Sequence, residues 1–317
     1  MGAVALQMLV FTGGNLFSQV QKRVMYGDFE QWIVRDIDES FLLGGNTRRI
    51  YDIGKRDTIK GNKVLNSNTI WGTSNAYAKV SGVVKTNLSV TPDKGPTGLC
   101  AKLENRLVSC KVIGLVDIEV LAGGSIFWGH NIEPVSNVRK PYKNMNWGVA
   151  FTLRPTALVL DYKASISQSG VITRCTTTSK GTYKGQDPAE MILILQRRSE
   201  DASGNITAKR VGTAWVHIGK SSGGWVKNYR IPVVYGDASK DPGYKSYKGL
   251  IGKDHDRCFY AKNKKGKIVP IDENAWADAD EQPTHAILMI TSTSQGAYCG
   301  NLDNVLWVDN VRLEYDE

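Results

Sequence analysis

One carboxylate stands where the sequence pattern predicts an apolar side chain. The segment WVDNVRLEY, residues 307–315, alternates like a β-strand, and Asp309 falls on the same face as Trp307, Val311 and Leu313. An ionised carboxylate without a partner in an apolar layer is costly, so it must be paired, bound to a metal or protonated. The pattern therefore predicts that Asp309 points into the core and that another group satisfies it.

Residues near the other end of the chain suggest calcium as that group. Asp28 and Glu30 lie in YGDFEQW, residues 26–32, and the first and last strands of jelly-roll sandwiches commonly lie side by side. Two or three carboxylates with main-chain carbonyls suit Ca²⁺, which takes about 6–8 oxygen ligands. We therefore predict a structural Ca²⁺ site formed by Asp28, Glu30 and Asp309. The alternative is that backbone amides or Arg312 satisfy Asp309, in which case no metal is needed.

Aromatic side chains next to small polar residues are candidates for sugar binding. Carbohydrate sites stack sugar rings on aromatic faces and clamp the hydroxyls with polar groups. Trp71 and Trp225 are flanked by Gly, Ser or Asn, as in exposed loop tips. The same tryptophans would equally suit a core, and the sequence alone leaves both interpretations open. The predicted carbohydrate-binding residues are Trp71, Asn75, Trp128, Tyr142, Trp147, Arg154 and Trp225.

A charged patch is the second candidate binding feature. Arg154 alternates with the apolar residues of its segment, and Asp161 and Lys163 alternate with those of the next one. If the two segments pair, the three side chains share one sheet face. Such a patch would bind a uronic acid or a sulfated sugar through the Arg fork, or it would be a solvated ion network.

Other kinds of chemistry find little support in the sequence. It contains no Gly-x-Ser-x-Gly elbow, phosphate-binding loop or dinucleotide fingerprint. The four histidines are scattered and no Cys-x-x-Cys pair is present, so zinc is not predicted. A glycosidase needs two carboxylates roughly 5–10 Å apart, and the sequence does not say which of the 31 acidic residues converge. We therefore assign no catalytic residue.

The elements that position these residues are strands. Glycine is frequent, at 32 residues, and apolar segments recur between turn signals, which favours an antiparallel β-sandwich of a dozen or so strands. The run Met191–Leu195 fits a strand that is buried on both faces, although a short helix competes there. Residues 260–270 read as a hairpin with a Lys-rich tip. With no repeat or linker, residues 20–317 are predicted to form one domain.

The net charge indicates the kind of binding partner, and the amino-terminal residues indicate whether the protein is exported. The net charge of +9 favours acidic partners, among which we predict a glycan, including acidic ones, rather than nucleic acid. Residues 1–19 contain an apolar run, 3–11, and resemble a secretory signal peptide without its basic start. An ordinary strand or a misplaced gene start are the alternatives. No apolar run approaches the ~18 residues of a membrane span, so no transmembrane segment is predicted.

Several motifs together resemble a known family. The opening GDFE-x-W is followed by AGGSIFWG (122–129), WGVAFTLRPTALVLDYK (147–163) and VDNVRLEY (308–315). In that order they resemble the family of secreted Bacteroidetes proteins named putative carbohydrate-metabolism domain. Residues 36–70 match it poorly, and LDYKASIS replaces a more aromatic stretch. The positions that fit the family pattern are Gly148, Phe151, Arg154, Pro155, Tyr162, Lys163, Asp309 and Asn310.

The resemblance implies a jelly-roll fold of the galactose-binding or carbohydrate-binding-module type. It also implies export, to the periplasm or the outer cell surface, and a part in glycan capture or breakdown. We therefore predict an exported, non-catalytic carbohydrate-binding protein of a glycan-foraging bacterium, with outer-membrane glycan-uptake proteins as candidate partners. The alternatives are a secreted glycoside hydrolase or polysaccharide lyase, and a structural surface or adhesion protein. Fold alone does not decide between them.

Overall fold

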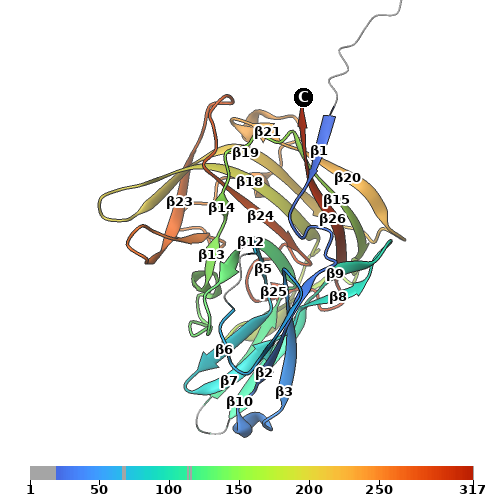
Figure 1. Cartoon of the computed structure of the whole chain (residues 1–317), viewed down its shortest axis with the longest axis vertical. Helices are drawn as coiled ribbons and strands as arrows, with labels where there is room; N and C mark the ends of the chain where they lie inside the picture. The colour runs from blue at the N-terminus through green and yellow to red at the C-terminus, as the bar shows by residue number, and fades with distance from the viewer. Residues whose placement is uncertain (1–18, 66–68, 113, 115, 317) are drawn as a thin grey trace, which may run out of the picture.

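The computed structural model describes residues 19–65, 69–112, 114 and 116–316 (Figure 1). They form an all-β structure in which two large sheets pack face to face, with smaller sheets at one end. The predicted β-sandwich is thus confirmed. The predicted signal peptide falls on residues outside this part of the chain, apart from Gln19, which begins the first strand. No helix among the described residues is long and apolar enough to cross a membrane.

The first sheet has six strands and contains both ends of the described chain. Their order is β20-β15-β26-β9-β8, and β1 also pairs with β26. The strands are β1 (Gln19–Arg23), β8 (Val90–Lys94), β9 (Leu99–Glu104), β15 (Ala157–Ser165), β20 (Val226–Pro232) and β26 (Val305–Asp316). Gln19 pairs with Asp316, so the two ends of the described chain lie side by side. The strand beside β26 is formed by residues 19–23, however, and not by the predicted 26–32. Figure 1 shows β1 lying along β26.

The second sheet has ten strands and runs in the order β13-β12-β24-β18-β19-β23-β22, with β5, β14 and β21 attached at its margins. One of its pairings, β19 with β23, is parallel, which departs from the predicted antiparallel pattern. The strands are β5 (Trp71–Thr73), β12 (Ser125–Asn131), β13 (Met145–Trp147), β14 (Val149–Ala150), β18 (Ala189–Glu200), β19 (Ile206–Ile218), β21 (Val234–Tyr235), β22 (Tyr260–Lys262), β23 (Ile268–Trp276) and β24 (His285–Thr291). β22 and β23 form the hairpin predicted over residues 260–270.

The remaining strands form small sheets, several of which lie below the sandwich in Figure 1. The three-stranded sheets are β2 (Trp32–Asp38), β3 (Thr47–Ile53) and β4 (Asp57–Lys60), and β16 (Val171–Cys175), β17 (Lys180–Lys184) and β25 (Cys299–Gly300). The two-stranded ribbons are β6 (Ala76–Val80) with β7 (Val83–Asn87), and β10 (Arg106–Val112) with β11 (Val116–Ala122). Four 3₁₀ turns span Phe41–Leu43, Pro141–Asn144, Ala238–Lys240 and Ser246–Lys248.

The core has two layers, one on each face of the ten-stranded sheet. Met191 and Leu193 of β18 pack toward the six-stranded sheet, whereas Ile192 and Ile194 pack on the other side with Phe259. The Met191–Leu195 run is therefore a strand buried on both faces, as predicted. The first layer also continues into the small sheets through Trp32 and Ile53. That continuity agrees with one domain over residues 20–317, which stays a prediction.

A β-bulge in β26 reverses the predicted alternation of the last strand. Asp309 pairs with Asp161 of β15, but the next regular pair is Arg312 with Val159, so two residues of β26 oppose one of β15. Asn310 adopts a positive φ of 52° there. Before the bulge the even-numbered residues face the core, and after it the odd-numbered ones do.

The bulge corrects the prediction that Trp307 shares a core face with Val311 and Leu313. Leu306 and Val308 join the core on one side of the bulge, and Val311 and Leu313 join it on the other. Trp307 therefore points to the outer face of the six-stranded sheet, where it is partly exposed. Alternation alone could not reveal this, because one extra residue switches the face of every residue beyond it.

We predict that the bulge depends on the residue type at position 310. Glycine adopts positive φ freely, whereas a β-branched residue is strained there by about 1–2 kcal/mol or more. Asn310→Gly should therefore unfold at a higher urea concentration than Asn310→Val, although both lose the Asn310 amide bond to Asp161. Equal midpoints for the two variants would contradict a left-handed residue at this position.

Candidate functional site

Three of the tryptophans predicted to be sugar platforms are core residues. Trp71, Trp128 and Trp147 are only 1%, 2% and 1% exposed. Trp71 packs edge-on against Trp128 at 6.3 Å between ring centroids, and Trp147 packs on Phe127 at 4.5 Å. The prediction that they present ring faces to a surface ligand is therefore wrong. Trp71 has Gly and Ser neighbours because it sits in a short strand pressed against β12, where Gly72 faces the Phe127 ring.

The prediction that Asn75 binds sugar is also wrong, because both polar atoms of its side chain form hydrogen bonds within the protein. Its side chain is fully buried. Its Nδ2 donates to the carbonyls of Tyr51 and Val90, each at 2.7 Å, and its Oδ1 accepts from the amides of Ser89 and Val90 at 2.9 Å. The amide thus joins three backbone segments.

Arg154 does not form the predicted patch with Asp161 and Lys163. The segment that was expected to be one strand over 147–155 stops at Ala150 in β14, so the alternation behind the prediction ends before Arg154. Its guanidinium donates to the carbonyls of Ala279 and Glu281 and stacks on the ring of Tyr235 at 4.0 Å. Asp161 and Lys163 do share the outer face of β15.

A row of aromatic and basic side chains crosses the outer face of the six-stranded sheet. Trp307 of β26 pairs with Lys163 of β15 on one side and with Lys102 of β9 on the other. Trp225 directly precedes Val226, the first residue of β20, and Val226 pairs with Tyr162, the neighbour of Lys163 in β15. Trp225 therefore stands at the end of β20 that lies beside Lys163. Both tryptophans are partly exposed. We call Trp225, Lys163, Trp307 and Lys102 the outer-face row.

The indole of Trp307 is fixed in place by its neighbours. Its Nε1 donates to Asp93 Oδ2 at 2.8 Å. The Nζ atoms of Lys163 and Lys102 lie 4.0 and 5.8 Å from the centre of a Trp307 ring. The bond from Trp307 holds the pKa of Asp93 below its usual range, which keeps that carboxylate ionised. The row is thus an oriented aromatic surface with a cation on either side.

Polar side chains adjoin the row along β15, β20 and β26. Asp161 Oδ1 accepts from the Asn228 amide at 2.7 Å, and Asp161 Oδ2 accepts from Asn310 Nδ2 at 3.0 Å. Arg312 donates to Asn228 Oδ1 at 2.7 Å. Sequence analysis missed Trp307, although the Asp-Asn pair that follows it was a usable signal, because Asn tolerates the left-handed conformation of a bulge.

Asp309 is buried, as predicted, and lies among other carboxylates. The prediction that it points into the core is wrong, because Asp309 precedes the bulge and pairs with Asp161 on the outer side of the sheet. Asp309 is 2% exposed, and its Oδ1 accepts one hydrogen bond, from the Asn310 amide at 2.7 Å. Burial, together with the nearby charges of Asp161, Glu30 and Asp28, raises the pKa of Asp309 to about 7. The Asn310 bond acts in the opposite direction. Asp309 is therefore largely protonated at mildly acidic pH when no cation is present.

The calcium prediction stays a prediction. Glu30 Oε1 accepts from the Leu99 amide at 3.0 Å, and Asp28 and Glu30 both lie near enough to Asp309 to affect its charge. In the part of the chain that the structure describes, however, no group of three or more His, Cys, Asp or Glu side chains is placed to hold a metal. A cation here would need main-chain carbonyls for most of its ligands. Arg312, the other predicted partner of Asp309, pairs with Asp161 instead, at 3.5 Å.

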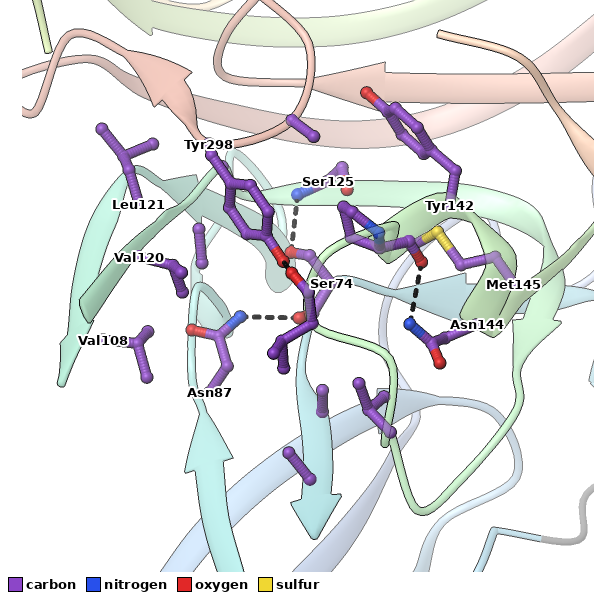
Figure 2. A pocket seen from close by; sticks show the side chains of 18 of the residues that line it. Ser74, Asn87, Val108, Val120, Leu121, Ser125, Tyr142, Asn144, Met145 and Tyr298 are labelled. Atoms are coloured by element: carbon purple, nitrogen blue, oxygen red, sulfur yellow. Dashed lines mark hydrogen bonds between the residues drawn. The ribbon is translucent and has the colours of Figure 1, made fainter. Parts of the chain in front are cut away.

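Two of the predicted residues meet at a cavity on the other side of the molecule. Tyr142 and Trp147, 6.1 Å apart between ring centroids, help to line a cavity of about 230 Å³ between the β6–β7 and β10–β11 ribbons and the ten-stranded sheet. Figure 2 shows Val120 and Leu121 on one side of the Tyr298 ring and Tyr142 on the other. The walls are mainly apolar, so this is not a surface of the kind that sugars bind.

Asp52 and Glu133 are a pair of neighbouring carboxylates whose oxygens are bonded within the protein. Asp52 Oδ2 and Glu133 Oε1 both accept from Arg35 Nη1, at 3.1 and 3.2 Å. The other two oxygens accept from Thr73 and from Arg35 Nη2, and Glu133 Oε1 also accepts from the Tyr77 amide. Burial raises the pKa of Asp52 to about 6. With each oxygen already bonded, this pair forms a buried ion network rather than an open glycosidase site.

Comparisons with known proteins give a weak likeness of fold. No family model matches the chain, and no curated protein matches it. A crystal structure from Bacteroides thetaiotaomicron described as a "putative glycoside hydrolase" is 16% identical, with a TM-score of 0.45 over 86% of this chain and 76% of that one. Another of the same description from Bacteroides vulgatus is 11% identical, with a TM-score of 0.44 over 94% and 95%. Likenesses this distant carry no argument about activity, and membership of the carbohydrate-metabolism domain family stays a prediction.

We predict that Asp309 makes stability depend on pH. The folded pKa of about 7 exceeds the unfolded value of about 3.9, so the folded state holds the extra proton between these values. The free energy of unfolding should therefore fall as pH rises from about 4 through 7. Asp309→Asn should remove this part of the dependence and be more stable than wild type at pH 8 in EDTA, by on the order of 2–4 kcal/mol.

Calcium changes the expected result. If Ca²⁺ binds beside Asp309, millimolar CaCl₂ should raise the wild-type melting temperature at pH 8 and leave Asp309→Asn unchanged. If neither CaCl₂ nor EDTA changes the wild-type melting temperature, the predicted Ca²⁺ site is contradicted. Parallel pH profiles for the two proteins in EDTA would contradict the protonation of Asp309.

Proposed function

We propose that this protein binds carbohydrate on the outer face of its six-stranded sheet, without chemistry of its own. The observation that carries the proposal is the outer-face row, in which Trp307 lies between Lys163 and Lys102 and Trp225 lies beyond Lys163. Aromatic faces stack on sugar rings, and the neighbouring amides and carboxylates are suited to sugar hydroxyls. The row extends over three neighbouring strands, with Trp225 just before a fourth, which favours a chain of sugars over a single one.

Preorganisation supports the same function. The bond from Trp307 Nε1 to Asp93 fixes the ring plane before any ligand arrives, and Asn228, Asn310 and Arg312 are held in one hydrogen-bonded network. Groups that are already ordered lose little entropy on binding. Ligand binding would explain why these polar residues form an ordered network on a sheet face that does not pack in the core.

An acidic glycan is the ligand that fits the row best. The Lys163 ammonium lies over the Trp307 ring, where a cation–π contact contributes about 0.5–1 kcal/mol at an exposed site. A neutral sugar that stacks on the ring displaces this cation without replacing the contact. A sugar carboxylate or sulfate can pair with the displaced ammonium, so the loss is offset. The net charge of +9 favours the same partner by long-range attraction.

The proposal includes export to the periplasm or the outer cell surface, with glycan capture or utilisation as the role. The family resemblance supports these points through residues such as Asp309 and Asn310, which lie at the bulge in β26 next to Trp307. Structural Ca²⁺ beside Asp309 and a glycan-uptake partner at the outer membrane belong to the same proposal.

We predict that the two tryptophans are required for binding. Trp307→Ala and Trp225→Ala should each weaken retention on acidic polysaccharides in affinity electrophoresis by about tenfold or more, since loss of a central aromatic contact exceeds ~1.4 kcal/mol. Trp276→Ala is the matched control, because Trp276 is also partly exposed but lies in β23 of the other sheet. All three variants are first checked for wild-type melting behaviour.

A glycan array with neutral and acidic polysaccharides, scored for both retention and product release, defines the activity. Retention that is lost equally in all three variants, or kept in both outer-face variants, would contradict the proposed surface. Release of shortened products by the wild type would replace the binding function with a catalytic one.

We also predict that the lysines select for charge. Lys163→Gln and Lys102→Gln should weaken binding of uronic acid polymers several-fold and reduce its dependence on salt, because screened charge pairs contribute less as ionic strength rises. Binding of a neutral polymer should be unchanged or slightly improved. Lys184→Gln, on the exposed strand β17, is the control. An equal loss for neutral and acidic polymers would show that the lysines act through packing rather than charge.

A further inference from the structure

The cavity beside Tyr142 is a second feature that a glycan-binding surface does not explain. It lies between the two small ribbons and the ten-stranded sheet, whereas the outer-face row belongs to the six-stranded sheet. Its volume is about 230 Å³. Lining residues such as Val108 and Tyr298 are partly exposed, so the cavity reaches the surface. A ligand could therefore enter without opening the sandwich core.

The walls of the cavity are apolar and carry no unpaired charge. Val108, Val120 and Leu121 line one side of it (Figure 2). No acidic residue lines it, and its two cations are already neutralised. Lys85 pairs with Glu39 at 2.9 Å, and Arg257 pairs with Glu190. Such walls favour an uncharged molecule with a hydrocarbon body, because burying an ion there would cost its hydration without providing a free counter-charge.

Two polar atoms of lining residues lack partners. Asn87 Oδ1 and Trp147 Nε1 are both buried and accept or donate no hydrogen bond. Figure 2 shows the Asn87 amide turned so that its nitrogen bonds to Ser74, which leaves the oxygen unused. An unsatisfied buried polar atom costs about 1–3 kcal/mol. A ligand hydroxyl could satisfy either atom, since it both donates and accepts.

We propose that this cavity binds a small neutral molecule with an apolar, ring-sized body and a hydroxyl or N–H group. A cavity of about 150 Å³ holds a single benzene ring, so 230 Å³ admits a somewhat larger body. The ligand is an aryl or alkyl alcohol, or an arylamine of similar shape, which is uncharged at neutral pH. The site is separate from the outer-face row, so ligand binding in the cavity needs no residue of that row and no bound glycan.

The test uses N-phenyl-1-naphthylamine, a neutral fluorescent probe with one N–H. The wild type should enhance its fluorescence with one-site saturation. Three matched competitors then define the chemistry: 2-naphthol should displace the probe at a concentration several-fold lower than naphthalene, and 2-naphthoate should be weaker than 2-naphthol. Absence of saturation, or better competition by 2-naphthoate, would overturn the proposal.

Variants locate the probe. Val120 and Ala78 both line the cavity, so larger side chains there should fill it. Val120→Trp should weaken probe binding about tenfold, and the milder Ala78→Leu should weaken it severalfold. Val171→Trp adds the same indole at an exposed site in β16 and should bind like wild type. Trp307→Ala should also bind the probe normally. Unchanged binding in a folded cavity variant, or loss in either control, would place the probe elsewhere and overturn the assignment.

Discussion

Asp161 and Asp309 face one another across β15 and β26, and two carboxylates so placed cannot both be charged at low cost. The two carboxylates differ in the hydrogen bonds that they accept. Asp161 receives hydrogen bonds from Asn228 and Asn310, whereas Asp309 has a single bond from the amide that follows it. Burial, together with the nearby carboxylates, raises the pKa of Asp309 to about 7, so Asp309 holds a proton at mildly acidic pH. The same Asn310 that donates to Asp161 forms the bulge, so electrostatics and strand geometry depend on each other here.

The outer-face row follows from this bulge. If β26 alternated regularly along its length, either Trp307 would enter the core or Val311 and Leu313 would be exposed. The extra residue places both apolar halves of the strand in the core and leaves the indole outside, next to Lys163. A local irregularity of one residue thus lets β26 contribute apolar side chains to the core along its whole length and still place Trp307 on the outer face.

The sequence predicted the features that depend on local pattern. The sandwich and the doubly buried run at Met191–Leu195 come from alternation and apolar content. Asp309 is buried as expected, although the bulge places it on the outer side of the sheet rather than in the core. The features it failed to predict depend on partners distant in the chain. Trp71 looked like a loop residue, because nothing near it indicates that β12 and Trp128 cover it. The pairing of Lys163 with Trp307 was likewise invisible, since a bulge decides on which side the ring lies.

The antiparallel pairing of Gln19 with Asp316 has a mechanical consequence. The two ends of the described chain leave the sheet at the same edge, side by side. A force that pulls them apart would load the β1–β26 hydrogen bonds one after another, like opening a zipper, rather than all together in shear. The edge strand would peel away at low force as far as Arg23, where the Val24 amide bonds to Val311 next to the bulge. Tension on the chain would thus reach Asp309 before it reached the core.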